Sequence, residues 1–240
     1  MRRLIAASSF LLSLLVGSVG RASPKNSPSP IPTTCVPSNA TSALLELERN
    51  PARHQLPVRI RLLGFSRHGR FALLEQREGE EIEGGLWTVR VIDLETNGSI
   101  LEEELETDVD TMDAFCESHR ERLSQILATH QIEASPLPKL AQFPITHQGI
   151  RISLALRRGN KTTAAVRPFE IWLSTKGRPR QLGVVEQIYV ESGRDPTGAP
   201  RVLGVLTSPF EPRIAVLIRQ DLVGTEAAVI PLVRVFGAKL

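Results

Sequence analysis

The chain has 240 residues, of which 41% are hydrophobic and 23% are charged, and its formal net charge is +3. Three of the 29 basic residues lie within residues 1–22, which hold no acid, so the rest of the chain balances 26 basic against 26 acidic residues. This balance gives no reason to expect nucleic-acid binding, and about 200 residues are enough for one domain with a sizeable core.

The N-terminus has the organisation of a secretory signal peptide. Met1-Arg2-Arg3 precedes an apolar, Leu-rich run over residues 4–19, and the small residues Gly20 and Ala22 follow it. The run is short for a membrane span, so residues 1–22 predict an export signal, and no transmembrane span is expected in the mature chain. Residues 23–39 are rich in Pro and Ser and predict an extended linker. We therefore expect an exported protein, periplasmic or extracellular.

The two cysteines, Cys35 and Cys116, predict a disulfide. A lone pair of cysteines in an exported chain meets an oxidising compartment, where such pairs form bridges. The alternative is a reactive Cys116 next to His119, three residues further along the same expected helix. Catalysis by a thiol would also need a group that orients the base, and the sequence marks none.

Residues 40–240 predict a single β-rich domain that begins with hairpins over residues 57–95. Residues 40–49 are compatible with a short helix that Pro51 ends. Apolar and basic residues alternate from Val58 to Leu62, which is typical of a half-buried strand. A turn at Gly69 leads to a second strand from Phe71. A third strand over residues 86–94, with Trp87 on one of its faces, ends in an Asn-Gly turn signal at residues 97–98.

This hairpin region also contains an ordered pattern of single residues. A Gly-Phe-Ser-x-x-Gly-Arg turn is followed by a glutamate, an acidic glycine-bearing loop and a Val-Ile-Asp-Leu strand; the residues concerned are Gly64, Phe65, Ser66, Gly69, Arg70, Glu75, Val91, Ile92, Asp93 and Leu94. The pattern resembles the N-terminal signature of a bacterial family of predicted secreted proteins of unknown function. The family's loop usually holds a Tyr-bearing Asp-Gly-Ser-Gly run, which differs from residues 78–85 here. The resemblance implies export and no particular reaction.

Residues 108–131 predict one long amphipathic helix. Apolar residues recur at steps of three and four, namely Val109, Met112, Phe115, Cys116, Leu123, Ile126 and Leu127. Thr107 or Asp108 would cap its start, and Asp110 and Asp113 suit its first turn. A calcium-binding loop would need a glycine and a glutamate that are absent from these positions.

Residues 148–236 predict about six further strands with short connections. The expected strands are 150–156, 166–174, 182–191, 201–207, 213–220 and 227–236. Short connections favour antiparallel neighbours, and Pro231 favours an edge strand or a bulge. The fold class expected from these patterns is α+β and mostly β, with antiparallel meander sheets and the 108–131 helix packed on one face or end.

The sequence marks no catalytic, cofactor-binding or metal-binding residues. The five histidines lack the spacing of a zinc site, and no nucleophile elbow, phosphate loop or dinucleotide motif occurs. Two sets of cations lie at expected turns: Arg157, Arg158 and Lys161, and Lys176, Arg178 and Arg180. We expect them on adjacent turns, either as solvated side chains or as a cationic rim for anionic polymer or lipid headgroups.

The loop over residues 78–85 is the expected binding loop. Glu78, Glu80, Glu81 and Glu83 lie among three glycines, and Trp87 follows where the next strand begins. A partly exposed Trp beside such a loop would be a common interface anchor. The alternative is an exposed hairpin loop that its charges keep solvated.

These observations favour a non-catalytic binding or structural domain of the cell envelope, with an envelope protein or polymer as its partner. The alternative is a periplasmic or secreted hydrolase whose acids are distributed over the fold, for example Glu75, Asp93 or Asp195. Paired carboxylates cleave glycosides only when they lie about 5–10 Å apart.

Overall fold

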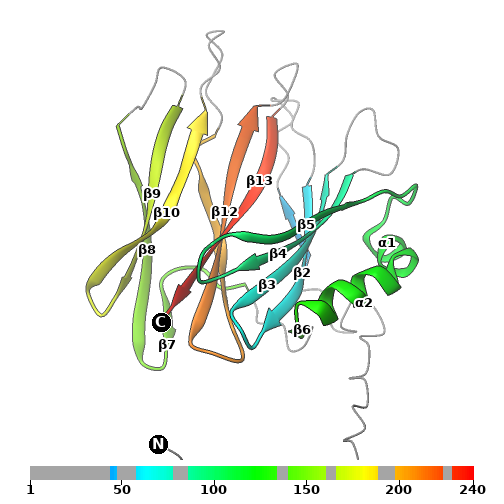
Figure 1. The fold of residues 1–240 in the computed structure, drawn as a ribbon. Helices are drawn as coiled ribbons and strands as arrows, with labels where there is room; N and C mark the ends of the chain where they lie inside the picture. The colour runs from blue at the N-terminus through cyan, green and yellow to red at the C-terminus, as the bar shows by residue number, and fades with distance from the viewer. Residues whose placement is uncertain are drawn as a thin grey trace, which may run out of the picture. The chain divides into compact units, whose positions relative to one another are not determined.

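The computed structural model describes residues 44–47, 58–77, 86–133, 140–160, 166–188, 198–223 and 229–240 (Figure 1). The chain divides after Ile31 into two units, and every described residue belongs to the second. The predicted signal peptide, the predicted linker over residues 23–39 with Cys35, and the acidic loop 78–85 lie outside the described residues.

The N-terminal sheet contains six antiparallel strands. Its order is β1 (Leu44–Leu47), β2 (Val58–Ser66), β3 (Arg70–Arg77), β4 (Leu86–Asp93) and β5 (Ser99–Leu105), and β6 (Ile132–Glu133) also pairs with β2. The expected helix over residues 40–49 is wrong at its centre, because Leu44–Leu47 pair with β2 as a strand. Its Leu-Leu-Glu-Leu sequence allows both structures, and pairing with the buried β2 decides between them.

The signature residues of the hairpin region shape this sheet. Gly64 lies at a bulge with φ of 150°, where a Cβ would lie 2.1 Å from the carbonyl oxygen of Glu133, so β6 packs directly on its backbone. Ser66 Oγ accepts hydrogen bonds from the backbone N–H of His68 and of Arg70, at 3.1 and 3.0 Å. These contacts close the turn at Gly69, and they give the pattern a structural role.

Two short helices replace the single helix predicted over residues 108–131. Helix α1 spans Met112–Ser118, and α2 spans Arg120–Thr129. Thr111, rather than Thr107 or Asp108, caps α1, because its Oγ1 accepts from Ala114 N at 3.2 Å. The helices separate at His119, where Ser118 Oγ donates to Phe115 O and competes for that carbonyl. Among the described residues, neither helix is long and apolar enough to cross a membrane.

Cys116 is buried in α1 and carries no free thiol, which speaks against the reactive-cysteine alternative. The side chain of Arg61 donates to Cys116 Sγ at 3.6 Å and to Asp113 at 3.0 Å, so β2 and α1 are also joined by polar contacts. The predicted partner, Cys35, lies outside the described residues, and the Cys35–Cys116 pairing stays a prediction.

The C-terminal strands form two antiparallel sheets instead of one meander. The first has the order β10 (Arg178–Ile188), β9 (Val166–Thr175), β8 (Ile150–Arg158) and β7 (Ile145–His147). The second has the order β11 (Arg201–Thr207), β12 (Arg213–Val223) and β13 (Val229–Lys239). Pro231 lies in β13 at an edge of its sheet, as predicted, where its missing N–H costs no sheet hydrogen bond.

Three apolar cores hold the layers together. One lies between the helices and the N-terminal sheet, and the next between the opposite face of that sheet and the β11–β13 sheet. The third lies between the β11–β13 sheet and the β7–β10 sheet. Alternate residues of β12 enter different cores, for example Leu217 and Ile218, and this explains why its sequence is apolar at nearly every position. The mostly β, antiparallel fold was predicted correctly, and the two helices pack on a sheet face, one of the two placements expected for the single helix.

Candidate functional site

Trp87, the proposed anchor of the binding loop, is fully buried, so that part of the prediction is wrong. Its ring stacks on Phe115 of α1 with centroids 4.1 Å apart and an interplanar angle of 2°. The alternation of β4 points Trp87, Val89 and Val91 toward the helices. An indole in this core stabilises the contact between helix and sheet and cannot meet a partner. Glu78, Glu80, Glu81 and Glu83 lie outside the described residues.

The acids considered for a hydrolase are not brought together among the described residues. Glu75 pairs with Thr88 across β3 and β4, whereas Asp93 lies five residues further along β4, on the order of 15 Å away. Burial raises the pKa of Asp93, but hydrogen bonds from the backbone of Thr96 and Glu95, with nearby Arg213, lower it overall. Asp93 thus stabilises a turn. Asp195 lies outside the described residues.

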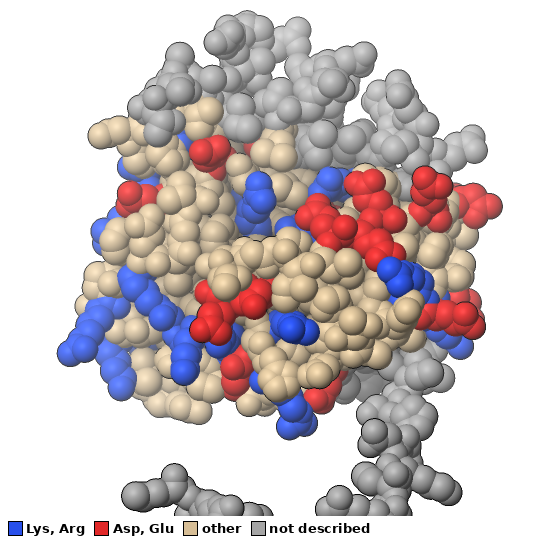
Figure 2. All heavy atoms as spheres, in the orientation of Figure 1, with Lys and Arg blue, Asp and Glu red and all other residues tan. Residues whose placement is uncertain are grey.

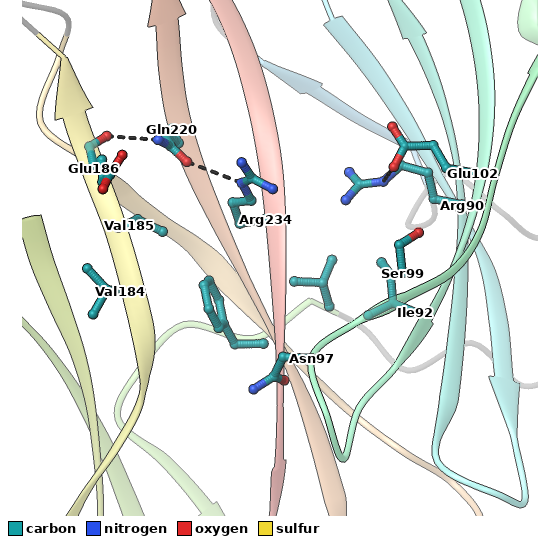
Figure 3. Close-up of a pocket in the computed structure, with 12 residues that line it drawn as sticks. Arg90, Ile92, Asn97, Ser99, Glu102, Val184, Val185, Glu186, Gln220 and Arg234 are labelled. Atoms are coloured by element: carbon teal, nitrogen blue, oxygen red, sulfur yellow. Dashed lines mark hydrogen bonds and ion pairs between the residues drawn. The ribbon is translucent and has the colours of Figure 1, made fainter.

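A cavity of about 410 Å³ lies where all three sheets meet (Figure 3). The N-terminal sheet, the β11–β13 sheet and the edge strand β10 each contribute to its wall; the lining residues are Arg90, Ile92, Asn97, Ser99, Glu102, Val184, Val185, Glu186, Gln220, Arg234, Val235 and Phe236. One wall is therefore apolar, and the rest carries two guanidinium groups, two carboxylates, two amides and a hydroxyl group. The volume suits a small molecule or one residue of a larger partner.

Arg90 enters the cavity from the face of β4 that is turned away from the helices and toward the β11–β13 sheet. Its Nη1 donates to the carbonyl oxygen of Val233 at 2.9 Å and to Glu75 Oε2 at 3.4 Å. Glu75 is fully buried and also accepts from Arg77 at 2.8 Å. These contacts hold one edge of the Arg90 guanidinium against the protein.

The Nε atom of Arg90, by contrast, is buried without a hydrogen-bond partner. Glu102 Oε2 is 3.8 Å from this Nε, which is close enough for attraction but too far for a hydrogen bond. An unpaired, buried N–H of a cation costs roughly 1–3 kcal/mol or more. A ligand oxygen that took the place of the Glu102 carboxylate beside Nε would recover that energy.

Arg234 faces Arg90 across the cavity. Its Nε donates to Gln220 Oε1 at 3.2 Å, and Gln220 Nε2 donates to the carbonyl oxygen of Glu186 at 2.9 Å. Figure 3 shows the guanidinium groups of Arg90 and Arg234 directed toward one another. Burial lowers the pKa of Arg234 and the charge of Arg90 lowers it further, against the opposing effect of Glu102, Glu186 and Glu75. An anion bound between the two arginines would reduce the electrostatic repulsion between their guanidinium groups.

Asn97, in the turn between β4 and β5, fixes the geometry of this cavity. It has φ of 61°, and its side chain accepts from Gly237 N at 2.6 Å and donates to Leu182 O at 3.3 Å. Gly237 lies so close to the backbone that follows β4 that a Cβ there would be 1.9 Å from the carbonyl oxygen of Leu94. One side chain thus joins the edges of the β11–β13 and β7–β10 sheets to the N-terminal sheet.

The arrangement is suited to holding an anion. Two guanidinium groups and Gln220 supply fixed hydrogen-bond donors, and Arg is well matched to a planar carboxylate. The described lining contains no histidine or cysteine, and its one hydroxyl, Ser99 Oγ, donates to Leu101 O at 3.0 Å. Ion pairing and hydrogen bonding are therefore what these residues offer.

The residues that line this cavity were not predicted as a site from the sequence, although one signal was present. Arg90 and Arg234 each interrupt an apolar strand in the sequence Val-Arg-Val. A charge at a core-facing strand position needs a partner, so such an arginine is a reasonable candidate for a site. Glu102, Glu186 and Gln220 carry no comparable signal.

The predicted cationic rim is not one cluster. Arg158 pairs with Phe169 at one end of the β8–β9 hairpin, whereas Ile152 pairs with Thr175, next to Lys176, at the other end. Successive turns of an antiparallel meander lie at opposite ends of its strands, which separates the two sets. Lys161 lies outside the described residues.

No family model matches this chain, and searches of the curated proteins and of the solved structures find no match either. The resemblance of residues 64–94 to a family of secreted proteins stays a prediction.

Proposed function

We propose that this chain is an exported, non-catalytic binding domain of the cell envelope that holds a carboxylate of an envelope component between Arg90 and Arg234. The observation that carries the proposal is the buried, unpartnered Nε of Arg90 at a cavity that a second guanidinium faces. The apolar wall of Val184, Val185 and Phe236 would contact the aliphatic part of the same ligand.

The position of Glu102 supports this reading and makes it testable. Glu102 is exposed and lies near Arg90 Nε without a hydrogen bond to it, so its carboxylate competes for the position that a ligand carboxylate would occupy. Removal of its charge should therefore strengthen binding of a carboxylate, whereas a purely structural ion pair would give no gain in affinity.

The test is calorimetric titration of the mature protein with succinate, an N-acetyl amino acid and inorganic phosphate. We expect the carboxylates to bind, Arg234→Ala to weaken binding about tenfold through loss of one charge-assisted contact, and Glu102→Gln to tighten it. Glu104→Gln on the same strand is the matched control and should behave as the wild type. Binding that Arg234→Ala leaves unchanged, or the absence of heat with all three probes, would refute the proposal.

Export is tested separately. A signal peptide over residues 1–22 places the N-terminus of the exported protein at Ser23. N-terminal sequencing of protein recovered from outside the cytoplasm should therefore begin close to Ser23. An intact Met1 on such material would contradict export through cleavage, whatever the cavity binds.

A further inference from the structure

The outward face of the β7–β10 sheet carries an exposed polar strip. In β8, Arg151, Ser153 and Arg157 are exposed and alternate with residues that face the core. The register places Ser153 opposite Ser174 and Ala155 opposite Trp172, so β9 continues the same face. We use the name outer strip for six residues of this face: Arg151, Ser153, Arg157, Trp172, Ser174 and Lys176.

One end of the outer strip is a shallow cavity of about 470 Å³ with donors suited to an anion. Arg151 and Lys176 supply positive charge, Ser153 and Ser174 supply hydroxyl groups, and the turn glycines Gly149 and Gly177 complete the wall. Figure 2 shows Lys and Arg gathered over the end of this sheet where the β7–β8 and β9–β10 turns lie, whereas Asp and Glu gather over β5 and α1. No acidic residue is among those that line this cavity.

The other end of the outer strip is an arginine stacked on an aromatic ring. The Arg157 guanidinium lies 4.7 Å from the centre of the Trp172 ring, and Trp172 Nε1 donates to Glu170 Oε2 at 2.8 Å. Contact with the ring face positions the guanidinium, which is the donor group that Arg157 offers to an anion. Arg157 is six residues along β8 from Arg151, a distance of about 20 Å.

We propose that the outer strip binds an anionic polysaccharide, a function distinct from the carboxylate cavity at Arg90. One small anion cannot reach both ends of the strip, whereas a chain with repeated carboxylates contacts both at once and gains affinity from their linkage. The hydroxyl groups of Ser153 and Ser174 lie between the cations and match the hydroxyl groups of a sugar chain.

Two other anionic partners fit the strip less well. Binding to a membrane surface also needs inserted apolar side chains, and among the described residues the exposed large ones are Ile100 and Val184, on different sheets. Nucleic-acid binders usually carry a clear excess of positive charge, whereas basic and acidic residues balance beyond residue 22. The envelope location of the polysaccharide rests on the proposed export.

Trp fluorescence gives a direct assay because the chain has two tryptophans and Trp87 is buried against Phe115. Titration of the mature protein with polygalacturonate should change the emission of Trp172, and dextran, a neutral polymer, should not. The change should diminish with added NaCl, as expected for exposed charges. Arg151→Ala/Lys176→Ala should weaken binding about tenfold, the effect of losing two exposed ionic contacts together.

Arg201→Ala/Lys239→Ala removes the same charge from the β11–β13 sheet and should bind polygalacturonate as the wild type does. Arg234→Ala should also leave this binding unchanged, and Arg151→Ala/Lys176→Ala should leave succinate binding unchanged, so the two sites fail or succeed independently. Equal loss in both double variants would overturn the proposal, as would tighter binding to duplex DNA or to phosphatidylglycerol vesicles than to polygalacturonate.

Discussion

Asn97→Ala tests how the three sheets are joined around the cavity. The substitution removes the hydrogen bond from Gly237 N at 2.6 Å and the one to Leu182 O at 3.3 Å. Each is worth about 1 kcal/mol net, and an alanine at φ of 61° adds roughly 1 kcal/mol of backbone strain. We therefore expect Asn97→Ala to lower the free energy of unfolding by about 3 kcal/mol.

Asn97→Gly separates the two causes. Glycine loses the same hydrogen bonds but accepts the positive φ, so its cost should be about 2 kcal/mol. Urea unfolding followed by far-UV circular dichroism measures both variants, and a shifted midpoint with an unchanged slope identifies a change in stability. Asn160→Ala, at an exposed position after β8, is the control and should stay within about 0.5 kcal/mol of the wild type. If both Asn97 variants matched this control, the bridging role of Asn97 would be refuted.

Three further predictions concern Trp87, the Cys35–Cys116 disulfide and His130. Trp87→Ala should lower the free energy of unfolding by about 3–5 kcal/mol, because it leaves a cavity in the core between β4 and α1. A decrease of less than about 1 kcal/mol, measured by urea unfolding, would contradict the stacked arrangement. The oxidised, purified mature protein should show no titratable thiol and should yield a peptide linking Cys35 to Cys116, whereas two free thiols would rule the bridge out. Burial lowers the pKa of His130 below 6.5, and Arg70 lowers it further, so the folded state binds a proton less readily than the unfolded state. Stability should therefore fall as the pH drops below about 6.5, and His130→Gln should reduce that fall, which unfolding at a series of pH values measures.

Alternation in the sequence was a good guide to strands whose two faces differ. It gave Trp87, Val89 and Val91 one face in β4, and it placed β11 at residues 201–207, as the structure has it. It missed β5, where a run of glutamates hides the pattern. Leu101 and Leu105 of that strand pack on the helix side, and Glu103 between them pairs with Arg122 of α2 at 2.7 Å. An ion pair with a residue of another element thus stabilises an acid at a strand position where alternation predicts an apolar residue.

The helix boundary was missed for a local reason that sequence periodicity does not record. The three- and four-residue spacing continues through His119, and it is the competition of Ser118 for the Phe115 carbonyl that accompanies the break. His119 then stacks on Phe115 with ring centroids 4.4 Å apart, which keeps the apolar stripe continuous across the two helices. The stripe was therefore predicted correctly although the helix was not.

Only part of the cavity at Arg90 could be predicted from the sequence. The alternation of β4 directs Val89 and Val91 to the helices and therefore directs Arg90 to the opposite face. That face is also buried, so the guanidinium of Arg90 needs hydrogen-bond acceptors there. The acceptors come from elsewhere: Glu75 lies one strand away, and Val233 lies 143 residues along the chain. Pairing within one meander follows from short connections, whereas the packing of separate sheets depends on side-chain fit over whole faces. A buried arginine in a Val-Arg-Val strand therefore indicates that a site exists, and only the packed sheets supply Arg234 and Gln220 to complete it.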